Sequence, residues 1–298
     1  VMSHRALVRD HRRIKELLEA RDDGNGNGNG DPDAMVGQSR AFRDVLSLAK
    51  QVAKAEAPVL VAGDEGTGKR RLVRAVHDWS SRAEGPFVEF NVGMVGDDIV
   101  EDELTSAIEK AKGGTLALIG VSMLSEKAQG VLRGFFDDTS DDAPRLISTT
   151  KEDLRETVES GKMPQDLVYR LGVVNLHLPS LRERREDIPL LAAHFVREHA
   201  DAYGRPRLAL SERAIGIIEA FDWPGNIRQL SACMQRAVVA ARGRQIEARD
   251  LPREVLEKGG ASDDGPPPIP GSTLEDIERY AIMSTLESTG GSTARAAK

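Results

Sequence analysis

Short apolar runs alternate with longer amphipathic stretches between residues 35 and 179 of this chain. The short runs are rich in β-branched residues and are bounded by Gly, Pro or polar residues, which is typical of buried strands. The predicted strands are Pro58–Ala62, Phe87–Asn91, Thr115–Ile119, Pro144–Ser148 and Val173–Leu178. The predicted helices between or beside them are 40–54, 68–79, 101–111, 124–136 and 164–171. This alternation predicts parallel βαβ units and a three-layer α/β sheet.

Beyond the last predicted strand the pattern becomes helical. The clearest helices are Ile188–His199, Ser211–Ala220 and Asn226–Ala241, so we predict a separate all-helical subdomain after the α/β part. The predicted division of the chain begins with a linker helix at 1–22 and a flexible linker at 23–33. An α/β subdomain at 34–180 and a helical subdomain at 181–257 follow. A Pro/Gly linker at 258–271 then leads to a C-terminal helical segment at 272–298.

Both ends of the chain predict helices that linkers join to the core. Residues 5–20 carry one apolar stripe, which fits either a short coiled coil with a second copy or a connector helix with one packed face. The Gly/Asn run at 24–30 is typical of a flexible linker, and the proline-rich run at 259–271 predicts a stiffer one. Ser272–Glu275 then has the sequence of a capped helix start.

Composition and charge narrow the class of protein. The chain has 298 residues, of which 40% are hydrophobic and 30% charged, as in a soluble globular protein, and no apolar run approaches membrane-spanning length. Its single cysteine, Cys233, excludes an intrachain disulfide and suits the cytoplasm; we expect it to pack in a helix. The net charge of −7 argues against coating nucleic acid with the whole surface, but leaves room for a local DNA-binding element.

Residues 63–69 read Gly-Asp-Glu-Gly-Thr-Gly-Lys, between an apolar strand and a helix. Glycines allow backbone N–H groups to curl around phosphate oxygens, and Lys69 supplies charge for the outer phosphates. The competing interpretation is a glycine-rich turn with a surface lysine, but the flanking strand and helix favour a phosphate-binding loop. The predicted cofactor is ATP or ADP, and the loop residues predicted to bind it are Gly63, Asp64, Glu65, Gly66, Thr67, Gly68, Lys69 and Arg70.

The strand that should complete an ATPase site ends without an acid. A P-loop ATPase needs one carboxylate there for magnesium and usually a second to polarise the attacking water. Ile119 and Gly120 occupy those positions, and Arg70 replaces the Ser or Thr that ends the generic motif. Asp64 or Glu65 could take over the metal, but neither lies on that strand. We therefore predict no catalytic residues and no metal-ligating residues, which makes magnesium a doubtful cofactor.

From Met35 to about Pro252 the sequence resembles the AAA+ central domain of sigma-54-dependent activators, the bacterial enhancer-binding proteins. The matching runs occur in the family's order, at residues 36–39, 63–69, 76–82, 86–91, 166–171, 181–188 and 223–228. The resemblance implies that Val36 and Gly37 lie at the entry to an adenine pocket. It also implies that Arg228 reports nucleotide to a helical lid, although an ordinary salt bridge remains an alternative for it. Arg170 matches an arginine finger that acts in trans on a neighbouring subunit.

The C-terminal segment 274–298 resembles the start of the Fis-type helix-turn-helix that these activators carry. The helix that would enter the major groove is not in this chain. The resemblance therefore implies DNA as a partner, through a helix-turn-helix that is incomplete here. A plain dimerisation helix pair is an alternative. Residues 5–20 match the position where the family joins a receiver domain, which implies a two-component response regulator. The resemblance further implies self-association, as a dimer or an AAA+ ring, and RNA polymerase as a partner.

Other departures from the family lie at functional positions. The family's sigma-54-contacting loop should interrupt the segment 104–108, which runs straight across here. Lys151 replaces the sensor asparagine, and Pro164 replaces the second arginine finger. We therefore expect a transcription regulator that keeps a nucleotide-binding loop as an oligomerising or nucleotide-sensing scaffold, without ATP hydrolysis or sigma-54 contact. The alternatives are an active sigma-54 activator with substituted catalytic groups and an interaction subunit of mixed AAA+ rings.

Overall fold

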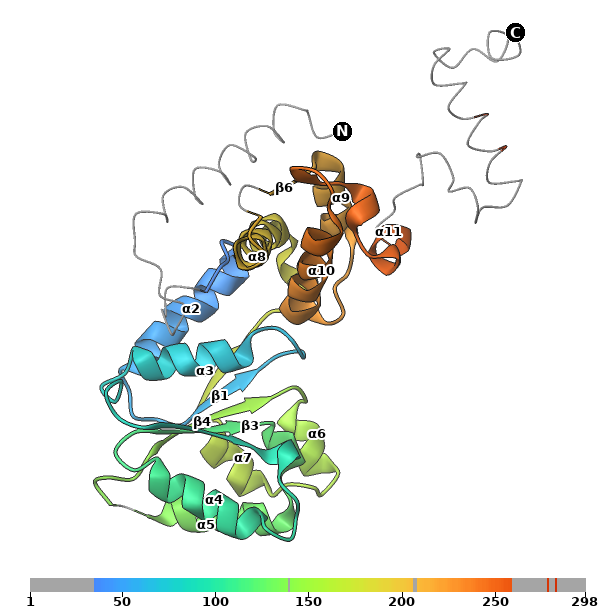
Figure 1. The fold of residues 1–298 in the computed structure, drawn as a ribbon. Helices are drawn as coiled ribbons and strands as arrows, with labels where there is room; N and C mark the ends of the chain where they lie inside the picture. Colours follow the sequence, from blue (N-terminus) through green and yellow to red (C-terminus); the bar gives the residue numbers. More distant parts are fainter. Residues whose placement is uncertain (1–34, 139, 206–207, 259–277, 279–281, 283–298) are drawn as a thin grey trace.

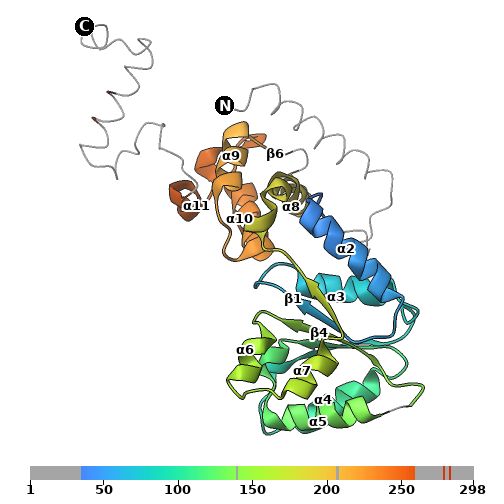
Figure 2. The same cartoon turned by 180° about the vertical axis from the view of Figure 1, so that it is seen from behind.

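A computed structural model describes residues 35–138, 140–205, 208–258, 278 and 282. The helix predicted at 5–20 lies outside these residues, as does all of the predicted C-terminal segment except Glu278 and Ile282. Figure 1 shows a sheet with helices on both faces, and a helical domain on the side of the sheet that α3 (Lys69–Asp78) covers. The same arrangement is seen from behind in Figure 2, where α2 (Arg40–Ala53) extends from α3 towards α8 (Ile188–Ala202) of the helical domain.

The sheet has five parallel strands in the order β2-β3-β4-β1-β5. Their bounds are β1 Val59–Ala62, β2 Phe87–Asn91, β3 Thr115–Ile119, β4 Arg145–Thr150 and β5 Val174–His177. The predicted α/β sheet is thus confirmed, and β2 and β3 match the predicted bounds. The predicted fourth strand was placed too early, because Thr149 and Thr150 pair with Val61 and Ala62 and extend β4 beyond Ser148.

Alternation along the strands separates two apolar cores. Val59 and Val61 face one side of the sheet, where Ala117 and Ile147 join them beneath α2 and α3. Leu60 faces the opposite side, in the core that contains α4, α5 and α7. The period of two in the strands therefore builds the three layers that Figure 1 shows.

The helices of the α/β domain are α2 Arg40–Ala53, α3 Lys69–Asp78, α4 Val100–Lys110, α5 Glu126–Asp137, α6 Leu154–Glu159 and α7 Gln165–Leu171. Short 3-10 turns, η2 Val92–Met94 and η3 Val121–Met123, follow β2 and β3. The helix α6 was not predicted, because six mostly polar residues are too few for a helical period to be recognised. Its Asp153 cap accepts a hydrogen bond from the backbone of Arg155, and Leu154 anchors it to the core.

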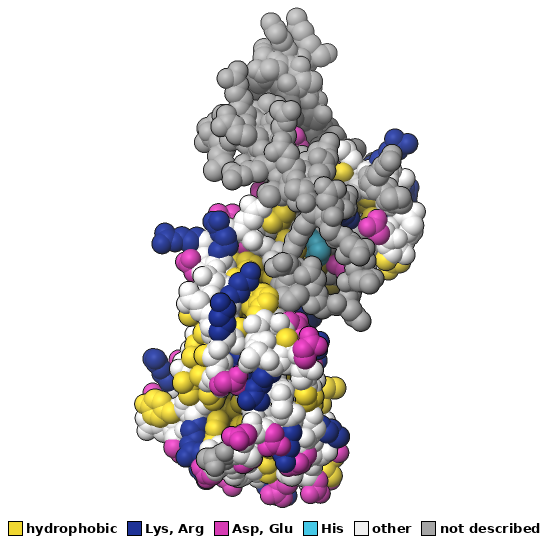
Figure 3. Space-filling model, turned by 90° about the vertical axis from the view of Figure 1, so that its left-hand side faces the viewer, with side chains coloured by type: hydrophobic (Ala, Val, Ile, Leu, Met, Phe, Trp, Pro, Cys, Tyr) yellow, Lys and Arg dark blue, Asp and Glu magenta, His cyan; other side chains and the backbone are white. Residues whose placement is uncertain are grey.

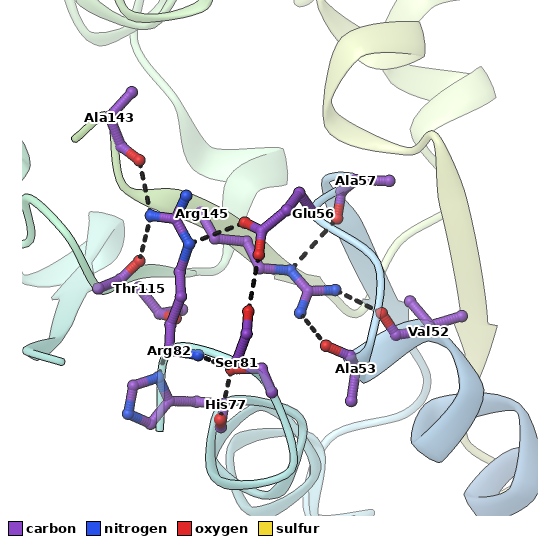
Figure 4. A network of polar contacts seen from close by, with 12 residues as sticks. Val52, Ala53, Glu56, Ala57, His77, Ser81, Arg82, Thr115, Ala143 and Arg145 are labelled. Carbon is purple, nitrogen blue, oxygen red and sulfur yellow. Dashed lines mark hydrogen bonds and ion pairs between the residues drawn. The ribbon is translucent and has the colours of Figure 1, made fainter. Parts of the chain in front are cut away.

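A network of polar contacts closes the edge of the sheet at which the strands begin, and Figure 4 shows it. The buried guanidinium of Arg145, the first residue of β4, donates to the carbonyls of Val52, Ala53 and Ala57 at 2.8, 2.9 and 3.4 Å. These carbonyls lie at the end of α2 or just after it, where a helix leaves acceptors unsatisfied. Arg82 pairs beside it with Glu56 at 2.7 Å. The network ties α2 and the α3–β2 loop to the start of the sheet.

The second domain is mostly helical. Its elements are η4 Leu181–Asp187, α8 Ile188–Ala202, β6 Ala209–Leu210, α9 Glu212–Ala220, α10 Asn226–Ala240, β7 Gln245–Ile246, η5 Ala248–Asp250 and α11 Arg253–Lys258. The prediction of an all-helical subdomain was wrong in one respect, since β6 and β7 pair as a two-stranded parallel sheet. This pairing satisfies the backbone of the extended segments before α9 and after α10. The core contains Trp223, whose indole N–H donates to the carbonyl of Ile218 at 2.8 Å.

Cys233 packs inside α10, as predicted, and is buried with a free thiol. Burial raises the pKa of this thiol to about 12, so the reactive thiolate is scarce at neutral pH. Among the described residues no helix is both long and apolar enough to cross a membrane. On the described part of the face in Figure 3, Lys and Arg side chains are interspersed with Asp and Glu rather than joined in one basic track.

Candidate nucleotide site

The loop between β1 and α3 turns through glycines whose backbone no other residue adopts without strain. Gly66 has φ of 77° and Gly68 has φ of 103°. A Cβ on Gly66 would lie 2.2 Å from the carbonyl oxygen of Gly225, so the loop also lies directly against the second domain. Gly68 is the N-cap of α3 and brings no capping side chain, which leaves the first-turn N–H groups of α3 directed towards the cavity described below.

Lys69 is held across this loop. Its Nζ donates to the carbonyl oxygens of Gly63 and Asp64, at 2.7 and 2.8 Å, which uses two of its three N–H donors. Burial lowers the pKa of Lys69, the carboxylates of Asp64 and Glu65 oppose that shift, and the positive charges of Arg228 and Lys151 add to it. An anion in the loop would place a negative charge in direct contact with this half-buried ammonium, whose two hydrogen bonds go to carbonyl oxygens.

The start of α10 contacts the loop through two side chains. Asn226 donates from Nδ2 to the carbonyl of Glu65 at 2.8 Å, and its Oδ1 accepts from the backbone N–H of Leu181 at 2.7 Å. Arg228 pairs through Nη1 with Oε1 of Glu65 at 2.7 Å. Both charged side chains of that pair are largely exposed, whereas Asn226 is buried. The loop is therefore connected to the helical domain by a buried amide and a surface ion pair.

A cavity of about 380 Å³ opens between the loop, the ends of β3 and β4, and the start of α10. The predicted nucleotide residues that line it are Glu65, Gly66, Gly68, Lys69, Arg70 and Arg228. Residues that line it without having been predicted as binding residues are Arg71, Ile119, Gly120, Ser122, Met123, Thr149, Thr150, Lys151 and Ile227. The parallel sheet explains the second group, because the carboxyl ends of adjacent strands share one edge.

Other predicted site residues lie outside the lining of this cavity. Val36 is buried in the core of the helical domain, and Gly37 packs so closely on Phe42 that a Cβ there would lie 2.4 Å from its ring. Asp64 turns towards Arg182, at 3.3 Å. Gly63 is also absent from the lining, and buried Thr67 donates through Oγ1 to the carbonyl of Asp64 at 2.8 Å.

Arg170 lies on α7, away from the cavity of its own chain. Its guanidinium pairs with Asp137 at 2.8 Å and lies 5.8 Å from the centre of the Phe136 ring. Nearly half of its side chain is exposed. The geometry leaves it accessible from outside the chain.

Arg184 is a residue beneath the loop that no spacing rule singled out. It is fully buried, stacks 4.4 Å from the centre of the Phe42 ring and donates to the carbonyl of Thr67 at 3.4 Å. Burial lowers the pKa of its guanidinium, and the charge of Asp187, 4.0 Å away, opposes that shift. Asp187 in turn accepts from the backbone N–H of Ser39 at 2.8 Å, so the pair joins the loop, α2 and the helical domain.

The end of β3 carries no acid. Ile119 and Gly120 line the cavity there, and the backbone N–H of Gly120 donates to the carbonyl of Thr149 at 3.0 Å. Among the described residues, no group of three or more His, Cys, Asp or Glu side chains is placed to hold a metal ion. The cavity is instead lined by cationic side chains, with Glu65 as its carboxylate. This lining suits a phosphate group better than a divalent cation.

Two family models match the chain in sequence. The sigma-54 interaction domain matches residues 35–177, and the AAA+ ATPase lid domain matches residues 182–266. The chain belongs to the sigma-54 activator family. It is similar to the transcriptional regulatory protein ZraR of Escherichia coli strain K12, with 38% identity over 293 residues that cover 89% of this chain. The chain spans 65% of the length of ZraR.

Solved structures of NtrX from Brucella abortus are similar to this chain as a whole. The complex of NtrX with ATP aligns with a TM-score of 0.71 and 28% identity, over 98% of this chain and 71% of NtrX. The complex with ADP aligns with a TM-score of 0.70 and 28% identity, over 98% of this chain and 70% of NtrX. The predicted family and fold, an AAA+ P-loop domain followed by a lid, are thus confirmed.

Proposed function

We propose that this chain is the AAA+ module of a transcription regulator that binds ATP or ADP without hydrolysing it. The observation that carries the proposal is the end of β3, where Ile119 and Gly120 line the phosphate cavity in place of two acids. Nothing at this position can ligate magnesium or polarise water, and each such loss costs orders of magnitude in rate. NtrX, which aligns with 98% of this chain, has been solved with ATP and with ADP.

The course of α4 supports a loss of sigma-54 contact. Where the family resemblance places the contacting loop, α4 runs as an unbroken helix from Val100 to Lys110. Its apolar stripe of Val100, Leu104 and Ala107 is buried against the core. A helix anchored by three successive turns leaves no projecting lever at this position.

Contacts between the loop and the lid support a nucleotide-sensing role. Glu65 is held by Arg228 through its carboxylate and by Asn226 through its backbone carbonyl. A nucleotide that attracts Arg228 to its phosphates would weaken the pair with Glu65 and thereby alter the seating of α10. We propose that this rearrangement regulates self-association, in which the exposed Arg170 contacts the nucleotide of a neighbouring subunit. We further propose DNA binding, input from a receiver domain and contact with RNA polymerase as properties of this regulator.

The test combines ATP binding with ATP turnover on the purified chain. We expect saturable ATP binding by calorimetry and no turnover above that of a blank. Lys69→Ala removes the charge at the loop and should weaken binding at least about tenfold, the usual size of one charge-assisted contact. Lys110→Ala, an exposed lysine in the last turn of α4, is the matched control and should bind like the parent chain.

Two results would contradict the proposal. Turnover that Lys69→Ala abolishes would favour the alternative of an active ATPase with substituted catalytic groups. No binding at millimolar ATP would make the loop a structural relic. The alternative of an interaction subunit predicts that a complete homologous ATPase gains turnover on mixing, and that Arg170→Ala removes the gain.

A further inference from the structure

Magnesium requires ligands that this cavity does not provide. Mg²⁺ in nucleotide sites is bound by one or two carboxylates or hydroxyls together with phosphate oxygens and water, at 2.0–2.1 Å. The two positions that normally supply such ligands hold Arg70 and Ile119. Because Arg70 is a cation and Ile119 is apolar, the residues present do not fit the metal that the family's fold implies.

The carboxylates around the cavity are already engaged by cations. Glu65 pairs with Arg228 at 2.7 Å, and Asp64 pairs with Arg182 at 3.3 Å. Glu89, on the neighbouring strand β2, pairs with Arg70. A metal ion could bind one of these acids only if the arginine paired with that acid were displaced. The displaced arginine would then repel the metal ion, which opposes metal binding.

Lys151 adds a charge where an uncharged sensor would normally stand. It follows β4 directly, and the last residue of that strand, Thr150, pairs in register with Ala62, the residue before the loop. Lys151, directly after β4, and Lys69, the first residue of α3 beyond the loop that follows β1, therefore line the same cavity. The ion pair of Lys151 with its neighbour Glu152 is long, at 3.9 Å, and both side chains are about half exposed. The ammonium is thus available to a ligand at low cost.

We propose that the cavity binds the polyphosphate of a nucleotide without a metal ion, with Lys69 and Lys151 taking over the charge neutralisation that magnesium normally provides. The inference rests on the nucleotide binding proposed above and adds the chemical form of the ligand. A metal-free nucleoside triphosphate carries more negative charge than its complex with the divalent magnesium ion. A cavity lined with cations attracts that form more strongly than the half-neutralised magnesium complex.

The first experiment titrates the chain with ATP at fixed ionic strength, once in EDTA and once with magnesium in excess. Binding in EDTA should be at least about threefold tighter than with magnesium, because the uncomplexed ligand carries more charge. Binding that appears only with magnesium would overturn the inference and leave the proposed nucleotide binding intact. Absence of binding in both buffers would overturn the proposed nucleotide binding itself.

The second experiment asks whether Lys151 is responsible. Lys151→Met keeps the length of the side chain and removes its charge, so affinity in EDTA should fall about tenfold, the size of one charge-assisted hydrogen bond. Lys162→Met is the matched control, since Lys162 is exposed, lies in the same domain and does not line the cavity. Equal affinities for these two variants would overturn the assignment of Lys151.

The third experiment reverses the preference. Ile119→Asp places a carboxylate at the end of β3, on the cavity wall. The variant should bind more weakly in EDTA and regain affinity when magnesium is added, so that the ratio of the two dissociation constants inverts. A ratio that stays at the parent value, in a variant that unfolds in urea like the parent, would overturn the inference.

Discussion

At the edge where the strands begin, Arg145 donates to three carbonyls and Arg82 pairs with Glu56 at 2.7 Å. At the edge where they end, Lys69 and Lys151 line an open cavity. Both edges therefore carry positive side chains, but only the first surrounds them with protein acceptors. The second leaves Lys69 with carbonyl dipoles and Lys151 with an ion pair of 3.9 Å.

This difference distinguishes cationic side chains that stabilise the fold from cationic side chains that are available to bind a ligand. A buried guanidinium must be satisfied by the protein itself, because an unpaired buried charge costs several kcal/mol. A cation in an open cavity remains hydrated, so it can stay unpaired until an anion arrives. Substitutions at the first edge should therefore change stability, and those at the second edge should change binding.

The strongest test of this comparison is Arg145→Met. It removes the buried donor from the carbonyl of Ala53 and one of the two donors from that of Val52, which also accepts from the backbone N–H of Ala55, and we expect unfolding in urea to show a loss of about 3 kcal/mol. Arg145→Lys keeps the charge but not the fork of donors, so its stability should lie between that of the parent and that of Arg145→Met. Lys151→Met should change stability by less than about 0.5 kcal/mol. Comparable losses at the two edges would break the comparison.

A second test sharpens the contact between the loop and the lid. Gly66→Ala combines a backbone at φ of 77° with a Cβ placed 2.2 Å from the carbonyl of Gly225, and should cost about 2–3 kcal/mol. Gly161→Ala is the matched control, because φ is 71° but nothing lies within 4 Å of the added Cβ. That control should cost about 1 kcal/mol, the strain alone.

Urea unfolding of the two glycine variants measures the difference directly. If Gly66→Ala loses more unfolding free energy than Gly161→Ala, the excess measures how strongly the start of α10 resists displacement from the loop. Equal costs would mean that the lid moves aside without loss, and that the contact is not a rigid one.

The two edges also differ in how far sequence could predict them. The strands and the loop were predictable because a period of two in apolar residues and a run of glycines are local signals. The absence of acids at Ile119 and Gly120 could also be read from the sequence, because these two residues lie at the end of the predicted strand Thr115–Ile119 and directly after it. The role of Arg145 was not, because an arginine at the start of a strand looks like a surface residue until the end of α2 is packed over it.

The convergence of Lys151 with Lys69 likewise depends on tertiary structure. It follows from the pairing of β4 with β1, and local patterns along a chain do not determine which strands become neighbours in the sheet. The misplaced end of β4 has the same origin, since Thr149 and Thr150 are polar and become strand residues only through that pairing. The prediction of the helical lid missed its short sheet because β6 and β7 have two residues each, too few for a period to be recognised.

The smallest expected effect concerns acid stability at the first edge. Burial acts to raise the pKa of Glu56, but the hydrogen bond from Ser81 and the charge of Arg82 outweigh it, so the pKa lies below its ordinary value of 4.5. A carboxylate whose pKa is lowered on folding stabilises the protein above the unfolded pKa, and that contribution is lost as the pH falls through the folded value. Glu56→Gln should therefore be less stable than the parent near pH 7, and the two should converge below pH 4.5.

Urea unfolding between pH 3 and 7 measures this convergence. The effect should be modest, since more than half of the Glu56 side chain is exposed and solvent screens its pair with Arg82. Glu159→Gln, at the exposed end of α6, controls for the loss of one surface charge. A difference between Glu56→Gln and the parent that persists unchanged to pH 3 would mean that the side chain acts through packing. The edge of the sheet where the strands begin would then be stabilised by Arg145 and its carbonyl partners rather than by the ion pair of Arg82 with Glu56.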